Sequence, residues 1–266
     1  MLRKLEKESI DIIQKIYARE KRVALLWSMG KDSTVLLWLC KKAFEGNIPF
    51  SVIHVDTTFK FPEMYEFRDH YAKEFEINLE IYKNKQALAK GINYSNNKAT
   101  DVCHQLKTKP LQKAVRDKKL CGLFVGIRSD EHNARGKESV ISMRESDFTF
   151  DARKGQNIQI KDVSEEIFKE GQHMRIHPIL KWTESDIWEY IKQENIPVCD
   201  LYFAKNGQRY RSLGCQPITK PIKSEAQTIQ DIITEIQGSA ITERSGRLQD
   251  KESAEAMQKL RSLGYM

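Results

Sequence analysis

Residues 22–44 read RVALLWSMGKDSTVLLWLCKKAF and hold the most informative pattern in the chain. Residues 22–27 form a short apolar run, which is typical of a strand that is buried on both faces. Residues 32–44 are strongly apolar and predict a helix, which Gly46-Asn47 ends. The turn Ser28-Met-Gly-Lys-Asp-Ser33 therefore joins a buried strand to the N-terminus of a helix.

This turn has the chemistry of a phosphate-binding site. A helix N-terminus presents unpaired N–H groups and a partial positive charge. Gly30 lets the backbone approach an anion closely, Ser28 and Ser33 add hydroxyl donors, and Lys31 adds a full positive charge. The spacing GxxxxGK[ST] is absent, so the turn is not a Walker A loop. An ordinary strand–turn–helix connection is the alternative interpretation of this segment alone.

Strands and helices alternate along the first half of the chain. Further buried strands are expected over residues 50–55, 77–82 and 122–126. Further helices are expected over residues 4–19, 63–75 and 104–118, and a polar loop over residues 84–101. The alternation predicts an α/β fold with a doubly wound, mostly parallel sheet and helices on both faces. Ligands of such sheets bind at the carboxyl ends of the strands.

The second half of the chain is harder to assign. Residues 128–175 are polar and charged, and no element is predicted there. Thr183 and Asp186 have the spacing of a capping box and open a helix that runs to about Gln193. Helices are also expected over residues 225–237 and over the last 20 residues. We therefore divide the chain into an α/β domain, residues 1–200, and a smaller, mostly helical C-terminal extension, residues 201–266, that packs over the active site.

Polar side chains also follow two other predicted strands. His54, Asp56 and Thr57 come at the end of the second strand, where Asp56 can accept a hydrogen bond from a nucleoside, help to hold Mg²⁺ or cap a turn. At the end of the fourth strand, three basic and three acidic residues suit a charged ligand beside a metal or, alternatively, form a solvated salt-bridged loop. They are Arg128, Asp130, Glu131, Arg135, Lys137 and Glu138.

Composition limits the classes of function. The chain has 266 residues, a formal net charge of +7 and a pI of about 9.0, which suits an anionic ligand or a lysine-rich surface. Five cysteines without a CxxC pair fit a reducing cytoplasm and argue against a disulfide framework. No signal sequence or membrane-spanning run is recognised, so no membrane partner is expected. RNP-like, helix-turn-helix and zinc patterns are also missing, so nucleic acid is not expected.

The turn resembles the pyrophosphate loop of the N-type ATP pyrophosphatases, with Met29 where that family has glycine. Further blocks make the chain resemble the small ATP-pyrophosphatase subunits (subunit 2) of the two-subunit bacterial sulfate adenylyltransferases. These blocks include His54-Val-Asp-Thr57, Lys60-Phe61, Arg128-x-Asp-Glu131, Arg135-x-Lys-Glu138, Trp182-Thr-Glu184, Leu201-Tyr-Phe-Ala204, Leu213-Gly-Cys215, Glu243-Arg244 and Gly246-Arg247. The resemblance implies a fold of the adenine nucleotide alpha-hydrolase-like type.

The resemblance also implies the reaction ATP + sulfate → adenylylsulfate + pyrophosphate, coupled to GTP hydrolysis on a separate large GTPase subunit. The residues implied for the β- and γ-phosphates and their Mg²⁺ are Ser28, Gly30, Lys31, Asp32 and Ser33, with Asp32 as the metal ligand. His54, Asp56 and Thr57 are expected to flank the nucleoside. The residues expected to bind sulfate and the α-phosphate are Arg128, Arg135 and Lys137, oriented by Asp130 and Glu131. Arg244 and Arg247 are expected to close over the site.

Two alternatives stay open. Longer family members carry an insertion where only Lys205 to Tyr210 intervenes here, which puts docking of the usual GTPase in question. It leaves room for an enzyme of the same fold with another acceptor, such as a thiolation enzyme, a reductase-like enzyme or one that activates another anion. A reductase is disfavoured, because the tail Leu260 to Met266 has no cysteine. The second alternative is a regulator that binds nucleotide or nucleic acid through the same loop.

Overall fold

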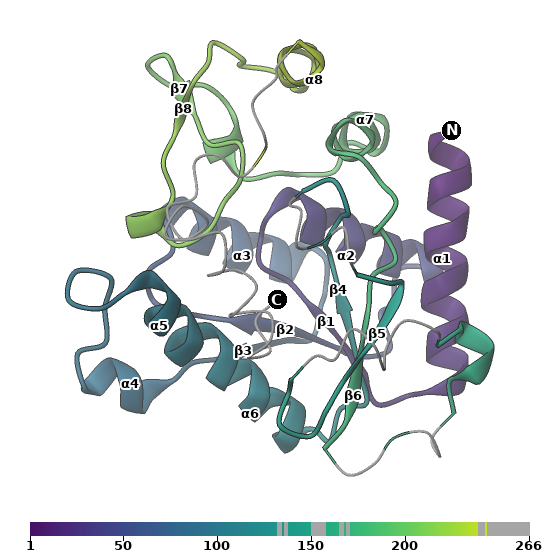
Figure 1. Cartoon of the computed structure of the whole chain (residues 1–266). Coiled ribbons are helices and arrows are strands. Elements are labelled where there is room, and N and C mark those ends of the chain that lie inside the picture. The colour runs from purple at the N-terminus through teal and green to yellow at the C-terminus, as the bar shows by residue number, and fades with distance from the viewer. Residues whose placement is uncertain are drawn as a thin grey trace.

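The computed structural model describes residues 1–131, 135, 138–149, 158–164, 168, 171–238 and 243. Within these ranges the helices are α1 (Leu2–Arg19), α2 (Lys31–Ala43), α3 (Pro62–Glu74), α4 (Lys85–Ala89), α5 (Ala99–Cys103), α6 (Lys109–Asp117), α7 (Glu184–Glu194) and α8 (Ile229–Gln237). The strands are β1 (Val23–Leu26), β2 (Ser51–Val55), β3 (Leu79–Tyr82), β4 (Gly122–Val125), β5 (Ile141–Arg144), β6 (His173–Ile176), β7 (Gln208–Arg209) and β8 (Ile222–Lys223). Figure 1 shows their arrangement.

A sheet with the strand order β3-β2-β1-β4-β6-β5 forms the centre of the described chain. Leu26 of β1 pairs in parallel with Ile53 of β2 on one side and with Val125 of β4 on the other, and β5 is antiparallel to β6. From β1 the chain goes to β2 and β3, then returns as β4 on the other side of β1. The strand order therefore reverses between β1 and β4, and the predicted mostly parallel, doubly wound sheet is confirmed.

Helices cover both faces of this sheet, as Figure 1 shows for α2 and α3 on one side and α6 on the other. Successive residues of a strand point to opposite faces. Val23 and Leu25 accordingly pack in the core that contains residues of α1, α2, α3 and α7, whereas Ala24 and Leu26 pack against α6. This two-sided burial explains why β1 is apolar at every position.

The predicted loop over residues 84–101 is wrong at both ends, where the structure has α4 and α5. Asn84 caps α4 by accepting a hydrogen bond from the backbone N–H of Ala87 at 3.0 Å. Both helices are only five residues long, which is too short to show the apolar periodicity on which the prediction depends. The predicted helix over residues 104–118 begins as a π-helical turn, η1 (His104–Thr108), which joins α5 to α6.

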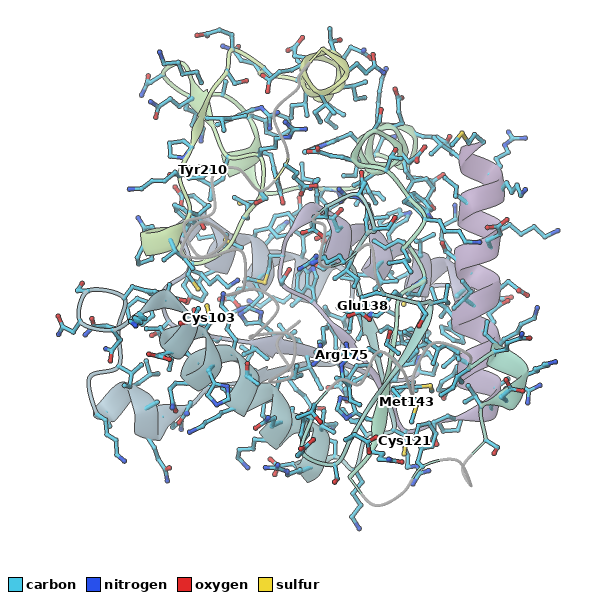
Figure 2. The ribbon with its side chains drawn as sticks, viewed as in Figure 1. Cys103, Cys121, Glu138, Met143, Arg175 and Tyr210 are labelled. Atoms are coloured by element: carbon cyan, nitrogen blue, oxygen red, sulfur yellow. The ribbon has the colours of Figure 1, made fainter. Side chains whose placement is uncertain are left out.

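The charged segment 128–175 contains two strands that the sequence did not indicate, β5 and β6. They pair so that Ser142 lies opposite Arg175 and Met143 opposite Met174, and Figure 2 labels Met143 and Arg175. β6 lies between β4 and β5 in the sheet, and its His173 and Arg175 are buried although both are polar. Buried polar residues in a strand give no hydrophobic run, which is why the pattern was missed.

Capping boxes start both later helices. The Thr183 hydroxyl accepts from the Asp186 N–H at 3.1 Å, and the Asp186 carboxylate accepts from the Thr183 N–H at 2.9 Å, as predicted. A second Thr–Asp capping box, Thr228 and Asp231, opens α8. This helix begins four residues later than expected. The short link at Lys205 to Tyr210 contains β7, which forms a hairpin with β8. The helix predicted for the last 20 residues lies outside the described residues, and the division at residue 200 stays a prediction.

None of the described helices combines the length and the apolar character that crossing a bilayer requires.

Candidate functional site

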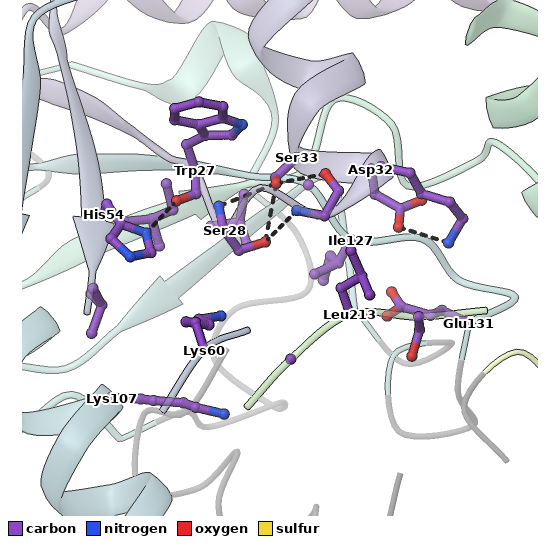
Figure 3. A pocket seen from close by; sticks show the side chains of 18 of the residues that line it. Trp27, Ser28, Asp32, Ser33, His54, Lys60, Lys107, Ile127, Glu131 and Leu213 are labelled. Atoms are coloured by element: carbon purple, nitrogen blue, oxygen red, sulfur yellow. Dashed lines mark hydrogen bonds and ion pairs between the residues drawn. The ribbon is translucent and has the colours of Figure 1, made fainter. Parts of the chain in front are cut away.

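The turn at residues 28–33 lies where the strand order reverses, at the carboxyl end of β1. Gly30 is the N-cap of α2. The hydroxyl oxygens of Ser28 and Ser33 are 3.0 Å apart, and the Ser33 hydroxyl donates to the carbonyl oxygen of Gly30 at 3.0 Å. Figure 3 shows the two serines together beside the pocket. The predicted strand–turn–helix arrangement is confirmed, and its role in binding phosphate stays a prediction.

Met29 occupies the position where the resembling loops have glycine, and its backbone explains that preference. Its φ is 63°, a left-handed conformation that costs most residues about 1–2 kcal/mol. The Met29 side chain is 1% exposed and packs in the core with residues of α2. Burial of a methionine is worth about 1.5–3 kcal/mol, which offsets the strain. Methionine therefore keeps the turn without taking up space in the pocket.

Gly126, directly after β4, fixes how closely the sheet approaches the turn. A Cβ atom there would lie 2.9 Å from both the Cα and the backbone nitrogen of Ser33. We expect Gly126→Ala to lower the free energy of unfolding by about 1–3 kcal/mol, because the start of α2 must move. Gly238→Ala is the control, since its nearest contact would be 3.7 Å. Urea denaturation of both variants measures the difference, and equal effects would contradict this account.

A pocket opens at the carboxyl ends of β1, β2 and β4. Seven of the residues predicted to bind the ligand line it: Ser28, Gly30, Lys31, Asp32, Ser33, His54 and Arg135, together with Glu131, which was predicted to orient the arginines. One wall is apolar and consists of Leu26, Ile53, Val55, Val125 and Ile127. A pocket with an apolar wall and a cationic, hydroxyl-bearing end suits an amphipathic ligand with a planar ring and a phosphate chain.

His54 has one ring nitrogen directed into the structure and one available to a ligand. Its Nδ1 lies 3.0 Å from the carbonyl oxygen of Trp27 and therefore carries the proton. Burial and then the neighbouring Lys60 lower the pKa of His54 to about 3, so the ring is neutral near pH 7. Among the described residues, the buried Nε2 has no hydrogen-bond partner. This nitrogen is thus an acceptor at the edge of the pocket.

Asp56 and Thr57 do not line the pocket, in contrast to the expectation that they flank the ligand. The Asp56 carboxylate accepts hydrogen bonds from the Tyr65 hydroxyl at 2.8 Å and the Thr58 N–H at 2.7 Å, and pairs with Lys83 at 2.8 Å. These contacts hold the segment that leads from β2 into α3. Asp56 thus caps this turn, as in the alternative interpretation, and its contact with a nucleoside stays a prediction.

Lys31 and Arg128 form a buried ion cluster with three carboxylates. Lys31 contacts Asp32 at 3.1 Å and also Glu243, while Arg128 contacts Asp32, Glu243 and, at 3.0 Å, Asp130. Burial alone would lower the pKa of Lys31, but Asp32 and Glu243 raise it. Burial likewise opposes ionisation of Glu243, but Arg128 and Lys31 lower its pKa. Lys31 and Glu243 are therefore charged near pH 7, whereas burial raises the pKa of Asp32 despite its contacts with Arg128 and Lys31.

This cluster changes the interpretation of Arg128. Its side chain is fully buried and does not line the pocket, because its guanidinium group is directed at carboxylates. Asp130 contacts Arg128, as expected, and Glu131 pairs with Arg135 at the pocket. Lys137, Arg244 and Arg247 lie outside the described residues.

The described residues do not fit a magnesium site built from protein ligands. No group of three or more His, Cys, Asp or Glu side chains in the described part of the chain is arranged to hold a metal. Asp32 is the predicted metal ligand, but one of its carboxylate oxygens contacts Arg128 and the other contacts Lys31. Mg²⁺ generally keeps phosphate and water ligands, which these side chains do not supply.

Several lining residues were not assigned to the site from the sequence. Lys60, Tyr202 and Glu243 belong to blocks of the family resemblance, whereas Lys107 gave no signal of its own. The Tyr202 hydroxyl accepts a hydrogen bond from the backbone N–H of Lys31 at 2.8 Å. It thereby satisfies one of the N–H groups that a helix N-terminus leaves unpaired.

Comparison with solved structures shows other proteins that share the fold of this chain. A phosphoadenylyl-sulfate reductase from Candida auris, in a phosphate complex, superposes with a TM-score of 0.56 at 16% identity, covering 81% of this chain and 94% of the other. A Candida glabrata FMN adenylyltransferase, in complex with FAD and pyrophosphate, gives a TM-score of 0.54 at 15% identity and covers 83% and 68%. At these identities the likeness concerns the fold alone.

Sequence comparison is more specific. The profile of the phosphoadenosine phosphosulfate reductase domain matches residues 22–221. Sulfate adenylyltransferase subunit 2 of Zymomonas mobilis is 38% identical, and that of Akkermansia muciniphila 36%, each over 99% of this chain and 97% of the relative. Both alignments run over 297 positions, more than the 266 residues of this chain, so the relatives carry additional residues. The chain therefore belongs to the sulfate adenylyltransferase subunit 2 family and carries a phosphoadenosine phosphosulfate reductase domain.

Proposed function

We propose that this chain is the small, ATP-cleaving subunit of a sulfate adenylyltransferase, which converts ATP and sulfate to adenylylsulfate and pyrophosphate. The observation that carries the proposal is the Ser28–Ser33 turn at the point of strand-order reversal, in a chain that is 38% identical to a relative of that name over 99% of its length. The identity of the acceptor is inferred from the relatives, and the site for the nucleotide is inferred from the pocket.

The nucleotide is proposed to lie with its base against the apolar wall and its triphosphate toward the turn. The wall is formed by Ile53, Val55 and Ile127, among others, and a base stacks on such a surface with little desolvation cost. His54 Nε2 is an acceptor for an amine or hydroxyl group of the nucleoside. The β- and γ-phosphates then face the N–H groups at the start of α2, together with Ser28, Ser33 and Lys31.

The reaction needs positioning and charge stabilisation but no covalent step on the protein. A sulfate oxygen forms a bond to the α-phosphorus, the bond from that phosphorus to the bridging oxygen breaks, and pyrophosphate leaves with the electron pair. Negative charge grows on the leaving group, where Lys31 and the helix N-terminus stabilise it. Sulfate is ionised near pH 7, so no general base is required.

Glu243 is proposed to compete with phosphate for Lys31 and Arg128, because its carboxylate contacts both cations. We expect Glu243→Gln to tighten pyrophosphate binding by about ten-fold, the value of a charged hydrogen bond. The same variant should melt at a lower temperature without ligand, since two buried cations lose a partner. The exposed Glu225→Gln is the matched control, and calorimetric titration with pyrophosphate is the measurement. Weaker binding of pyrophosphate to the Glu243 variant would contradict competition.

The proposal also includes a separate GTPase subunit, a cytoplasmic location and a C-terminal extension that closes over the site. The supporting observations are the word "subunit" in the relatives' names, the missing GxxxxGK[ST] in this chain, and Glu243, a residue beyond α8 that lies in the pocket. Adenylylation of sulfate by ATP is unfavourable, so coupling to GTP hydrolysis supplies its driving force.

Pyrophosphate release from ATP tests the proposal, measured with sulfate, with molybdate and without either, in the presence and absence of an elongation-factor-type GTPase. Release that depends on sulfate or its analogue molybdate is the expected result. Release only with a different acceptor would replace sulfate in the proposal by that acceptor. Nucleotide binding without any release would instead support a regulator.

A further inference from the structure

Two lysines lie on one side of the pocket, apart from the ion cluster. Figure 3 shows Lys60 and Lys107 together on that side, with Asp32 and Glu131 at the other end. Lys60 precedes α3, and Lys107 belongs to the π-helical turn η1. Such turns are rare and occur frequently at functional sites. Lys107 is only 9% exposed, so the fold holds this cation at the pocket wall.

The neighbouring Cys215 reports the strength of the positive potential at this side. Its thiol is fully buried, with its Sγ atom 3.2 Å from the Thr57 hydroxyl. Burial opposes the thiolate, as at Cys40, where it raises the pKa of the thiol. At Cys215, however, Lys107, then Lys60, and then hydrogen bonds with Thr57 and Tyr94 together outweigh burial and lower the pKa to about 7. Both lysines therefore favour an anion placed at this side of the pocket.

Of the three cations predicted to bind the acceptor, Arg128 and Arg135 are paired with carboxylates, and Lys137 lies outside the described residues. Arg128 is directed at Asp32, Glu243 and Asp130 and does not reach the pocket surface. Arg135 does line the pocket, but it is paired with Glu131. Lys60 and Lys107 place further positive charge on another side of the pocket.

We propose that Lys60 and Lys107 form the subsite for the acceptor, a tetrahedral dianion of the sulfate class. This inference rests on the proposed function, because it places the second substrate of that reaction. Lysine ammonium groups act as point charges and can contact separate oxygens of a tetrahedral anion. In Figure 3 Lys60 and Lys107 lie on the side of the pocket away from Asp32, a residue of the Ser28–Ser33 turn. The acceptor and the leaving pyrophosphate would then be on opposite sides of the α-phosphorus, as in-line displacement requires.

The test compares Lys60→Gln and Lys107→Gln with Lys109→Gln, which removes the same charge from an exposed position two residues from Lys107 that does not line the pocket. The KM values for sulfate and for ATP are measured with the GTPase partner. A second readout is independent of turnover: the rise in melting temperature on adding sulfate to the complex with α,β-methylene-ATP, against potassium chloride of equal ionic strength. Lys60→Gln keeps the test valid if the more buried Lys107 variant does not fold.

We expect each pocket variant to raise the KM for sulfate about ten-fold or more, to keep the KM for ATP within about two-fold, and to lose the sulfate-dependent thermal shift. Lys109→Gln should match the parent. Unchanged sulfate parameters in folded pocket variants would overturn the subsite, and so would an equal loss of ATP affinity. A parent without sulfate-dependent turnover but with a thermal shift that the pocket variants lose would refute the proposed function and still support the subsite. A parent without that shift would overturn the subsite.

Discussion

Lys31→Ala is expected to lower kcat/KM for sulfate-dependent pyrophosphate release by about 100- to 1,000-fold. The reason is that Lys31 sits at the N-terminus of α2 beside Ser28 and Ser33 and lines the pocket, where it meets the charge that develops on the leaving group. The pKa of Lys31 is raised by Asp32 and Glu243 despite burial, so it is charged at any pH at which the enzyme works. Loss of this cation should also weaken ATP binding.

Lys41→Ala is the control for this variant. Lys41 lies in the last turn of the same helix, donates to the carbonyl oxygen of Phe75 at 3.2 Å and does not line the pocket. The Lys31 variant should keep its fold, because the carboxylates of the cluster still contact Arg128. Circular dichroism then separates loss of activity from loss of fold. Parent activity in a folded Lys31 variant would remove the turn from the mechanism.

Arg128→Met is expected to lower the free energy of unfolding by about 3–5 kcal/mol, the range measured when one partner of a buried ion pair is removed. Methionine preserves much of the volume but leaves Asp32 and Glu243 with Lys31 alone. The exposed Arg3→Met on α1 should change stability by no more than about 0.5 kcal/mol. Chemical denaturation of both variants gives the comparison.

A double mutant shows whether this loss arises in the cluster. In the Glu243→Gln background one carboxylate is already neutral, so Arg128→Met should cost less than in the parent chain. Equal costs in the two backgrounds would mean that Arg128 stabilises the protein through packing and not through Glu243.

The sheet and the turn were predictable because their information is local. Apolar runs at 22–27 and 50–55 and the turn between strand and helix depend on neighbouring residues alone. The capping box at Thr183 is equally local. The strand β6 was not predictable, because buried His173 and Arg175 replace the apolar residues that indicate a central strand.

The side-chain contacts of the site were less predictable, because they join distant parts of the chain. Lys31 and Glu243 are 212 positions apart, and Arg128 and Asp32 are 96 apart. A charged residue at a strand end looks the same in sequence whether it faces a ligand or a carboxylate. Only tertiary structure separates Arg128, which faces carboxylates, from Lys107, which lines the pocket.

The bond of ATP that is broken distinguishes adenylyl transfer from hydrolysis of the terminal phosphate. Incubation with ATP labelled with ³²P at the α-phosphate and with ³⁵S-sulfate, in the presence of the GTPase partner and GTP, identifies it. We expect one nucleotide product that carries both labels, together with unlabelled pyrophosphate. Labelled ADP with free phosphate, and no product that carries both labels, would show cleavage between the β- and γ-phosphates and would contradict adenylyl transfer.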